Sequence, residues 1–315
     1  MEQLPNIPVI ILAIPLYILG MFLELALGKL HDRAKYEARD TAVSLSTQVF
    51  LSIEKLLTGA FLAAVLFFFY EYRLFDFQFS WFLVAICFIV DDFRHYLYHV
   101  ISHKVRWAWA SHIVHHSSQH FNYSTAMRQP PTEILTGLFV LYVPMALIGF
   151  HPVLIGFCTL TNLTYQFFIH TETIGKLHPK IEFIMNTPSH HRVHHSTNPK
   201  YLDSNFGGIF IIWDRLFNTF VEEDENEPCK YGIINNINTF NLLRVIFHEW
   251  IELFRDVLKP KLGVKDRLRY VFHRPGWSHD GSRRTTQMIK ETNKRLESTM
   301  NSTMPSKVSF RGGPR

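Results

Sequence analysis

Cysteine is scarce in this 315-residue sequence, and its three copies, Cys87, Cys158 and Cys229, lie far apart. Two of them sit inside apolar runs, so their spacing favours neither a disulfide framework nor a thiolate metal site. This usage is typical of a protein whose metal-binding part faces a reducing compartment. The sequence also has no low-complexity linker that would divide it into independently folding parts.

Apolar residues make up 47% of the chain and gather in long runs. The runs lie near residues 7–27, 56–70, 79–90 and 134–168. The last run is broken by Gly149-Phe150-His151-Pro152, which favours a helical hairpin that enters and leaves on one side of a membrane. The sequence therefore predicts an all-α integral membrane protein with about four transmembrane helices and a cytosolic, histidine-rich helical cap.

The start of the chain, Met1-Glu2-Gln3, lacks the positive charge of a signal peptide, so we expect the first apolar run to be a retained span. Four basic residues follow that run: Lys29, Arg33, Lys35 and Arg39. The loop after the second run has only Arg73 among acidic residues. The positive-inside rule therefore places residues 28–40 and the active site on the cytoplasmic side of a bacterial inner membrane, or of the endoplasmic reticulum in a eukaryote.

Histidine is concentrated in two windows, which hold 13 of the 18 copies: seven between His95 and His120, and six between His170 and His195. Three groups have helical spacing: His95, His99 and His103; His112, His115 and His116; and His191, His194 and His195. Each group places its imidazoles on one side of a helix. Such clustering indicates metal binding.

Nine or more clustered imidazoles exceed the need of one ion, because a structural zinc site takes four ligands and a catalytic one three plus water. The pattern therefore predicts two metal ions. Imidazole binds iron, zinc and copper alike, so the ligand type alone does not identify the metal. A membrane enzyme whose metal ions face the apolar chain of a lipid is expected to use dioxygen on C–H bonds. That reaction needs a redox-active metal, which favours iron over zinc. His95 and His190 are further candidate ligands, and Asn122, Tyr123 and Arg128 either orient the second histidine group or cap helices.

At these residues the chain resembles the fatty acid hydroxylase superfamily, which includes sterol desaturases and sterol methyl oxidases. Its HxxxH, HxxHH and HxxHH motifs correspond to residues 99–103, 112–116 and 191–195. Residues 109–118, 122–129 and 186–195 look most like the alkylglycerol monooxygenase branch, and the resemblance covers roughly residues 80–225.

The resemblance implies a di-iron centre, dioxygen as the oxidant, and His170 as a further ligand between the second and third motifs. The implied ligands are His99, His103, His112, His115, His116, His170, His191, His194 and His195. Tetrahydrobiopterin is a possible cofactor, but Lys104 stands where that branch has a glutamate, which counts against it. No cytochrome b5 motif follows His151-Pro152, so electrons are expected from a separate donor, such as a ferredoxin, a cytochrome b5-like protein or a reductase.

Four regions are expected along the chain. Membrane helices fill residues 1–79, the catalytic region spans 80–225, an amphipathic helical region spans 226–280, and a basic, disordered tail spans 281–315. The tail carries eight Lys and Arg against two Glu, which favours contact with anionic lipid over binding to nucleic acid.

The sequence thus predicts a membrane-bound, non-haem di-iron oxygenase that hydroxylates a fatty acyl, alkyl ether or sterol-like lipid. A desaturase of the C-5 sterol desaturase type is the alternative, because the same oxidant can remove a second hydrogen. A histidine-rich metal-binding or transport protein without catalysis is disfavoured, since the motifs lie at the membrane surface and not at mid-membrane. A zinc hydrolase is disfavoured because the HExxH glutamate is missing.

Overall fold

The computed structural model describes residues 9–31 and 35–303, and every regular element in these ranges is helical. The all-α prediction is confirmed for this part of the chain. Residues 1–8, which contain the start that we interpret as part of a retained span, lie outside the described residues, as do residues 304–315 of the tail.

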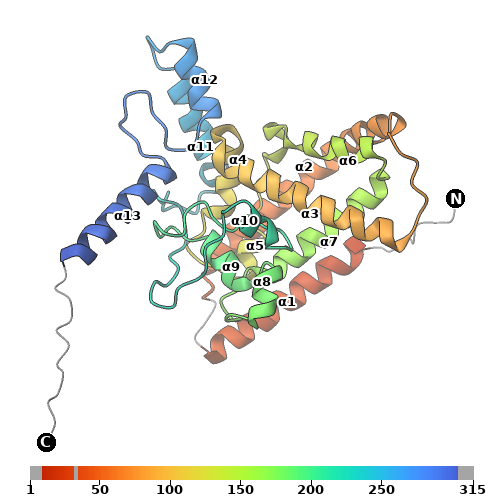
Figure 1. The fold of residues 1–315 in the computed structure, drawn as a ribbon, viewed down its shortest axis with the longest axis horizontal. Coiled ribbons are helices and arrows are strands. Elements are labelled where there is room, and N and C mark those ends of the chain that lie inside the picture. The colour runs from red at the N-terminus through yellow and green to blue at the C-terminus, as the bar shows by residue number, and fades with distance from the viewer. Residues whose placement is uncertain (1–8, 32–34, 304–315) are drawn as a thin grey trace, which may run out of the picture.

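Four long helices form the body of the molecule (Figure 1). They are α1 (Val9–His31), α2 (Ala38–Glu71), α3 (Trp81–Lys104) and α7 (Pro152–Ile169). Helix α3 begins where the side chain of Ser80 accepts a hydrogen bond from the Leu83 amide, and it packs against α7 along its length. Only Val105 separates its C-terminal end from α4 (Arg106–His116). The apolar helix α3 is therefore joined directly to the histidine-rich helix α4.

The predicted break in the 134–168 run is confirmed. Helix α6 (Val143–Ile148) ends at Gly149, whose φ of 125° is in a region that side chains disfavour, and a Cβ there would overlap the carbonyl oxygen of Phe75. Helix α7 then begins at Pro152, with the His151 side chain accepting from the Val153 amide. The first part of the run forms two short 3-10 helices, η1 (Glu133–Thr136) and η2 (Leu138–Tyr142), ahead of α6.

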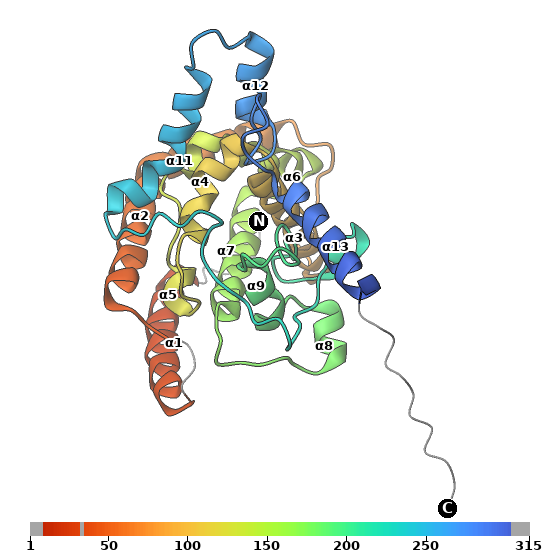
Figure 2. The ribbon, with the colours of Figure 1, turned by 90° about the vertical axis from the view of Figure 1, so that its left-hand side faces the viewer.

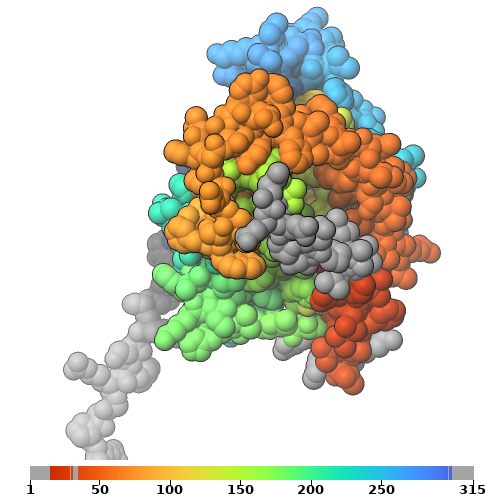
Figure 3. All heavy atoms as spheres, turned by 90° about the vertical axis from the view of Figure 1, so that its right-hand side faces the viewer, coloured from red at the N-terminus to blue at the C-terminus, as the bar shows by residue number. Residues whose placement is uncertain are grey.

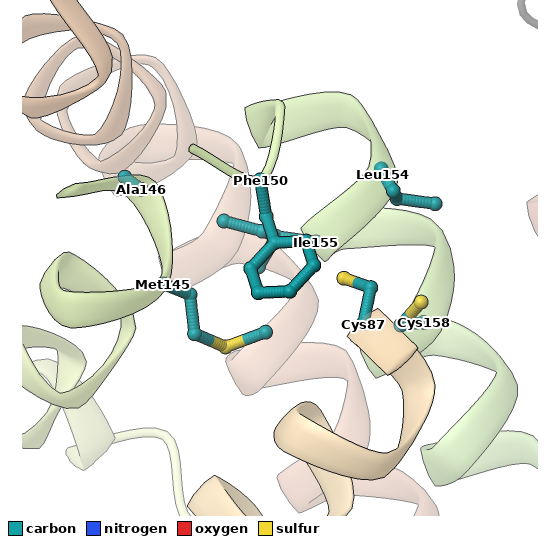
Figure 4. Packing of buried hydrophobic residues seen from close by; sticks show 7 residues of the cluster. All are labelled: Cys87, Met145, Ala146, Phe150, Leu154, Ile155 and Cys158. Carbon is teal, nitrogen blue, oxygen red and sulfur yellow. The ribbon is translucent and has the colours of Figure 1, made fainter. Parts of the chain in front are cut away.

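The main apolar core lies where α3, α6 and α7 meet (Figure 4). Its buried members are Cys87, Met145, Ala146, Phe150, Leu154, Ile155 and Cys158. Both cysteines in this core are free thiols and are fully buried, as small apolar side chains are. This core fixes α7 against α3 and so sets the position of the residues at the C-terminal end of each helix.

Two of the described helices, α2 and α7, are long and apolar enough to cross a membrane by length and composition. Shorter apolar stretches occupy Pro15–Gly28 in α1 and Leu138–Ile148. No residue in the apolar window of α2 is buried, and Leu56 is 81% exposed, although Leu66 and Phe69 pack partly buried against the core. In the space-filling view of Figure 3, the end of α2 and the start of α3 (orange) lie at the surface, where Trp81 is 72% exposed. Four spans remain a prediction.

The C-terminal helices pack against α4 and extend beyond it. Helices α11 (Leu242–Val257) and α12 (Val264–Phe272) project together from it (Figure 2). The amphipathic helix expected in region 226–280 is present as α11, which buries Trp250 and Leu253 and exposes Leu243 and Phe247.

Within the tail, for which the sequence predicts disorder, residues 286–303 form helix α13 (Thr286–Thr303). Two contacts hold its first turns to the body: the Thr286 hydroxyl donates to the Asp203 carboxylate, and the Lys290 Nζ atom donates to the Leu202 carbonyl oxygen at 2.6 Å. These partners lie more than 80 residues away in the sequence. The composition of the tail alone therefore does not predict these contacts.

Candidate metal centre

Helices α3, α4 and α9 (Pro188–His194) bring the histidine motifs to one place. His99 and His103 lie one turn apart on α3, and His112 and His116 lie one turn apart on α4. The extended backbone of Val105, with φ −117° and ψ 118°, separates the two helices and lets them pack against each other.

The nine implied ligands gather in two buried groups. The five-histidine group comprises His99, His103, His112, His116 and His194, and the four-histidine group comprises His115, His170, His191 and His195. Each residue offers one ring nitrogen, and within a group these nitrogens lie within 4.8 Å of one another. Helices α3, α4 and α9 each contribute to the five-histidine group. The four-histidine group also receives His170, which follows the last residue of α7.

Within each group the Nε2 atoms face one another at short range. In the five-histidine group, Nε2 of His112 lies 3.1 Å from that of His99 and 3.2 Å from that of His116. In the four-histidine group, Nε2 of His170 lies 3.2 Å from that of His115 and 2.9 Å from that of His191. Two nitrogens bound at right angles to one ion, each about 2.1 Å from it, would be about 3 Å apart. The observed spacing fits a shared metal ion.

Main-chain carbonyl groups hold the other ring nitrogen of several histidines. The Nδ1 atom of His99 donates to the Phe206 carbonyl oxygen at 2.9 Å, and that of His194 to the Ser204 carbonyl oxygen at 2.9 Å. His170 and His115 make the same contact with the carbonyl oxygens of Gln166 and Arg128, at 2.7 Å and 3.2 Å. A carbonyl oxygen only accepts, so the proton sits on Nδ1 and the Nε2 lone pair points into the group.

Burial keeps these imidazoles neutral, as metal binding requires. It lowers the pKa of His115 to about 4, and it lowers the pKa of His112 and His191 well below the usual value, with neighbouring imidazoles adding to the effect. The Nε2 atoms of His194 and His195 are buried and have no hydrogen-bond partner among the described residues. An orphaned buried acceptor is costly, and a bound metal ion would satisfy it. The residues therefore fit two metal ions.

The two further candidate histidines lie outside both groups. His95 is buried beside His99, with ring centroids 5.5 Å apart, and its Nε2 atom has no hydrogen-bond partner in the part of the chain that the structure describes. His190 caps α9, because its Nδ1 atom accepts from the Thr187 amide at 3.4 Å while its Nε2 atom lies 2.9 Å from the Glu182 carboxylate. His190 thus has a structural role in the helix that carries the third motif.

The remaining predicted residues differ in their relation to the histidines. Asn122 caps the short helix α5 (Tyr123–Ala126), and the Tyr123 ring stacks on Phe167 at 4.9 Å, so their own contacts are structural. Arg128 contacts the centre through its carbonyl oxygen, which accepts from His115. Its guanidinium group points away and pairs with Asp40 at 2.8 Å.

Two carboxylates near the centre were missed by sequence reasoning. The Oδ1 atom of Asp203 lies 3.4 Å from the Nδ1 atom of His103. Glu24, buried on α1, accepts from the Tyr123 amide at 2.7 Å and from the hydroxyl of Thr171, the residue after His170. A lone glutamate inside the first apolar run was a visible signal for Glu24, whereas nothing around Asp203 marks it in the sequence.

Comparison with known proteins agrees with this geometry. A family model described as fatty acid hydroxylase matches residues 84–219. Alkylglycerol monooxygenase of Homo sapiens is 37% identical over 278 residues, which cover 84% of this chain and 59% of that protein. Its Danio rerio counterpart is 35% identical over 272 residues, with the same two shares. A cholesterol 25-hydroxylase-like protein of Danio rerio is 29% identical over 141 residues, 43% of this chain and 54% of that protein.

The chain spans about 59% of the length of the two alkylglycerol monooxygenases. No solved structure matches it. The matched family region, residues 84–219, contains all nine histidines of the two groups. Residues 84–219 of the chain therefore form a region of the fatty acid hydroxylase family.

Proposed function

We propose that this protein is a membrane-bound, metal-dependent oxygenase that hydroxylates a lipid alkyl chain with dioxygen. The observation that carries the proposal is the convergence of nine buried histidines into two groups at the C-terminal end of α3, the helix whose other end is apolar and exposed. The family match and the names of the relatives support a lipid as substrate.

The two groups would hold one metal ion each. Two iron ions there would supply the redox chemistry that activates dioxygen and oxidises a C–H bond. Imidazole ligands suit iron, whereas zinc in the same groups would lack any redox chemistry. The chain's own part is to present neutral Nε2 atoms in fixed directions, which the carbonyl contacts of His99, His194 and His170 accomplish.

Aromatic rings pack against both groups and reduce the exposure of the imidazoles to water. Phe206 packs on the five-histidine group, with its ring centroid 5.1 Å from that of His103 and 5.7 Å from that of His194. Phe121 packs on the four-histidine group, 5.2 Å from His195 and 5.6 Å from His170. Excluding water prevents side reactions of a reactive oxidant.

The membrane arrangement follows from the apolar segments. We assign one span each to α1, α2 and the first half of α3, and a hairpin to α6 and α7, with the histidines on the cytoplasmic side of an inner or endoplasmic reticulum membrane. A lipid would then reach the centre from the membrane side. Electrons would come from a separate donor such as a ferredoxin, a cytochrome b5-like protein or a reductase.

The test combines metal analysis with product analysis. Protein grown on enriched iron and purified gently in detergent should contain about two irons per chain, with a Mössbauer spectrum of a coupled pair. Alkyl ether lipids, fatty acyl lipids and sterols are then supplied with a reductant, with and without tetrahydrobiopterin, and the products are analysed by mass spectrometry. Addition of one oxygen atom indicates hydroxylation, and loss of two hydrogens indicates desaturation.

A matched pair of variants completes this test. His194→Ala should abolish turnover, whereas His273→Ala, which changes an exposed histidine outside both groups, should retain it. One zinc per chain and no iron, even after anaerobic reconstitution with ferrous iron, would contradict the proposal.

A further inference from the structure

A cavity of about 290 Å³ lies between the end of α3, the loop after α12 and helix α13. Its charged lining consists of four cations and two carboxylates: Lys104, Arg274, Lys290, Lys294, Asp203 and Glu291. The lining comes from parts of the chain that are far apart in sequence, so the fold assembles it.

The two carboxylates are already engaged by neutral or histidine partners. Asp203 accepts from the Thr286 hydroxyl and lies 3.4 Å from the His103 Nδ1 atom. Glu291 accepts from the side-chain amide of Gln287 at 3.0 Å. Both carboxylates keep their charge, and four cations against two carboxylates leave a net positive charge around the cavity.

Among the side chains that the structure describes, which leave out Glu297 on α13, none of the four cations forms an ion pair. Two buried arginines elsewhere in the chain do form ion pairs: Arg106 pairs with Glu249, and Arg192 pairs with Glu223. Burial lowers the pKa of Lys290; the charge of Asp203 raises it in part, and the charges of Lys294 and Lys104 lower it again. The cations thus repel one another around an open space, an arrangement that a bound anion would stabilise.

We propose that this cavity binds a phosphate group together with the small polar moiety that carries it. Lys290 and Lys294 lie one turn apart on α13 and face the same space as Lys104 and Arg274. Lysine ammonium groups and an arginine fork are the usual phosphate ligands in proteins. The volume lies near the lower limit of small-molecule sites, so it suits a phosphate ester better than a single ion.

The site adjoins the metal centre. A smaller cavity of about 60 Å³ shares Asp203 with it and is lined by His103, His116, His194 and His195. Asp203 would therefore separate a ligand in the larger cavity from His103 of the five-histidine group. A soluble phosphate ester and a phospholipid headgroup share the proposed chemistry, and the proposal does not depend on the oxygenase activity.

The test is calorimetric titration of the full chain in a maltoside detergent, which contains no phosphate. The probes are inorganic phosphate, glycerol 3-phosphate, and phosphatidic acid in mixed micelles. We expect glycerol 3-phosphate or phosphatidic acid to bind, more tightly than inorganic phosphate and more weakly as the salt concentration rises. Binding of glycerol 3-phosphate identifies a soluble ester as the ligand class, and binding of phosphatidic acid alone identifies a headgroup.

The double variant Lys290→Gln, Lys294→Gln should weaken binding at least about tenfold, because it removes two charge-assisted hydrogen bonds. Lys265→Gln, on the exposed face of α12, makes the same charge change outside the cavity and should have less than about a twofold effect. Because Lys290 also anchors α13, Lys294→Gln alone serves as the variant that leaves this anchor intact. Absence of binding by all three probes, unchanged binding by Lys294→Gln and the double variant, or equal weakening by Lys265→Gln would overturn the proposal.

Discussion

Asp203 and His103 are 100 residues apart in the sequence, and the Oδ1 atom of Asp203 lies 3.4 Å from the Nδ1 atom of His103. The same carboxylate accepts from the Thr286 hydroxyl at the start of α13. Asp203 thus connects the five-histidine group to the C-terminal helix. A carboxylate in this position orients a metal-binding imidazole and raises its basicity.

Asp203→Asn should weaken metal binding about 10–100-fold, because the amide orients His103 less firmly and removes the charge that favours binding. Competition against a chromophoric chelator measures this change. Asp266→Asn, which breaks an exposed ion pair with Arg269, is the control with the same chemical change. Equal metal affinity of Asp203→Asn and the parent protein would show that Asp203 plays no part in the centre.

Single alanine substitutions should remove metal ions one at a time. His99 belongs to the five-histidine group and His170 to the four-histidine group. His99→Ala and His170→Ala should therefore each lower the metal content from about two ions to about one per chain, because each removes a ligand of only one ion. Mass spectrometric metal analysis gives the ratio. Retention of two ions by both variants would rule out the two-group arrangement.

Asp256 provides a pH-dependent contribution to stability. It pairs with Arg106 at 2.8 Å and with Lys259 at 2.8 Å, and its side chain is only 2% exposed. Burial raises its pKa, but the hydrogen bonds from Lys259, Arg106 and Arg283 outweigh this effect and lower it below the ordinary value. The stabilisation is therefore complete above the unfolded-state pKa, near 3.9, and is lost as the pH falls through the lower folded-state pKa.

Asp256→Asn should consequently destabilise the protein by about 3 kcal/mol at neutral pH, because it leaves the buried Arg106 with Glu249 as its remaining charged partner. Thermal unfolding in detergent at several pH values measures the difference. The gap between the parent and the variant should narrow as the pH falls below about 4. A gap that stays constant down to that range would mean that the charge of Asp256 contributes no stability.

Gly149 and Gly156 provide a matched pair for the hairpin. Gly149→Ala should destabilise the protein by at least about 2 kcal/mol, because alanine disfavours the positive φ and its Cβ would overlap the Phe75 carbonyl oxygen. Gly156→Ala places a Cβ in open space within α7 and should be neutral or stabilising by up to about 1 kcal/mol. Unfolding midpoints in detergent compare the two. Equal midpoints would show that the turn at Gly149 relaxes freely.

Most of the helices could be predicted from local sequence patterns. The i, i+4 spacing of His99 and His103, and of His112 and His116, predicted helices that the structure contains, because helical periodicity is a property of neighbouring residues. The break at Gly149 was equally local, since glycine and proline act on their own backbone. The division of the nine histidines into groups of five and four was beyond sequence reasoning, because it depends on how α3, α4 and α9 pack.

Contacts between distant segments could not be predicted from the sequence. Composition predicted disorder for residues 281–315, but Thr286 and Lys290 find partners at Asp203 and Leu202 that hold α13 in place. The sequence offered His190 as a further candidate ligand, and its contacts with Thr187 and Glu182 depend on the packing of α9 and could not be read from the sequence. Tertiary contacts decide such cases, and residue type alone does not distinguish them.

The carbonyl anchors of the histidines have an evolutionary consequence. The groups that fix the Nδ1 protons of His170, His194 and His99 are main-chain oxygens of residues 166, 204 and 206. A substitution at those three positions exchanges a side chain and leaves the peptide oxygen in place. The protonation pattern of these imidazoles therefore depends on the path of the backbone and not on the side chains at residues 166, 204 and 206. Relatives with other residues at these positions can still present the same Nε2 lone pairs to a metal ion.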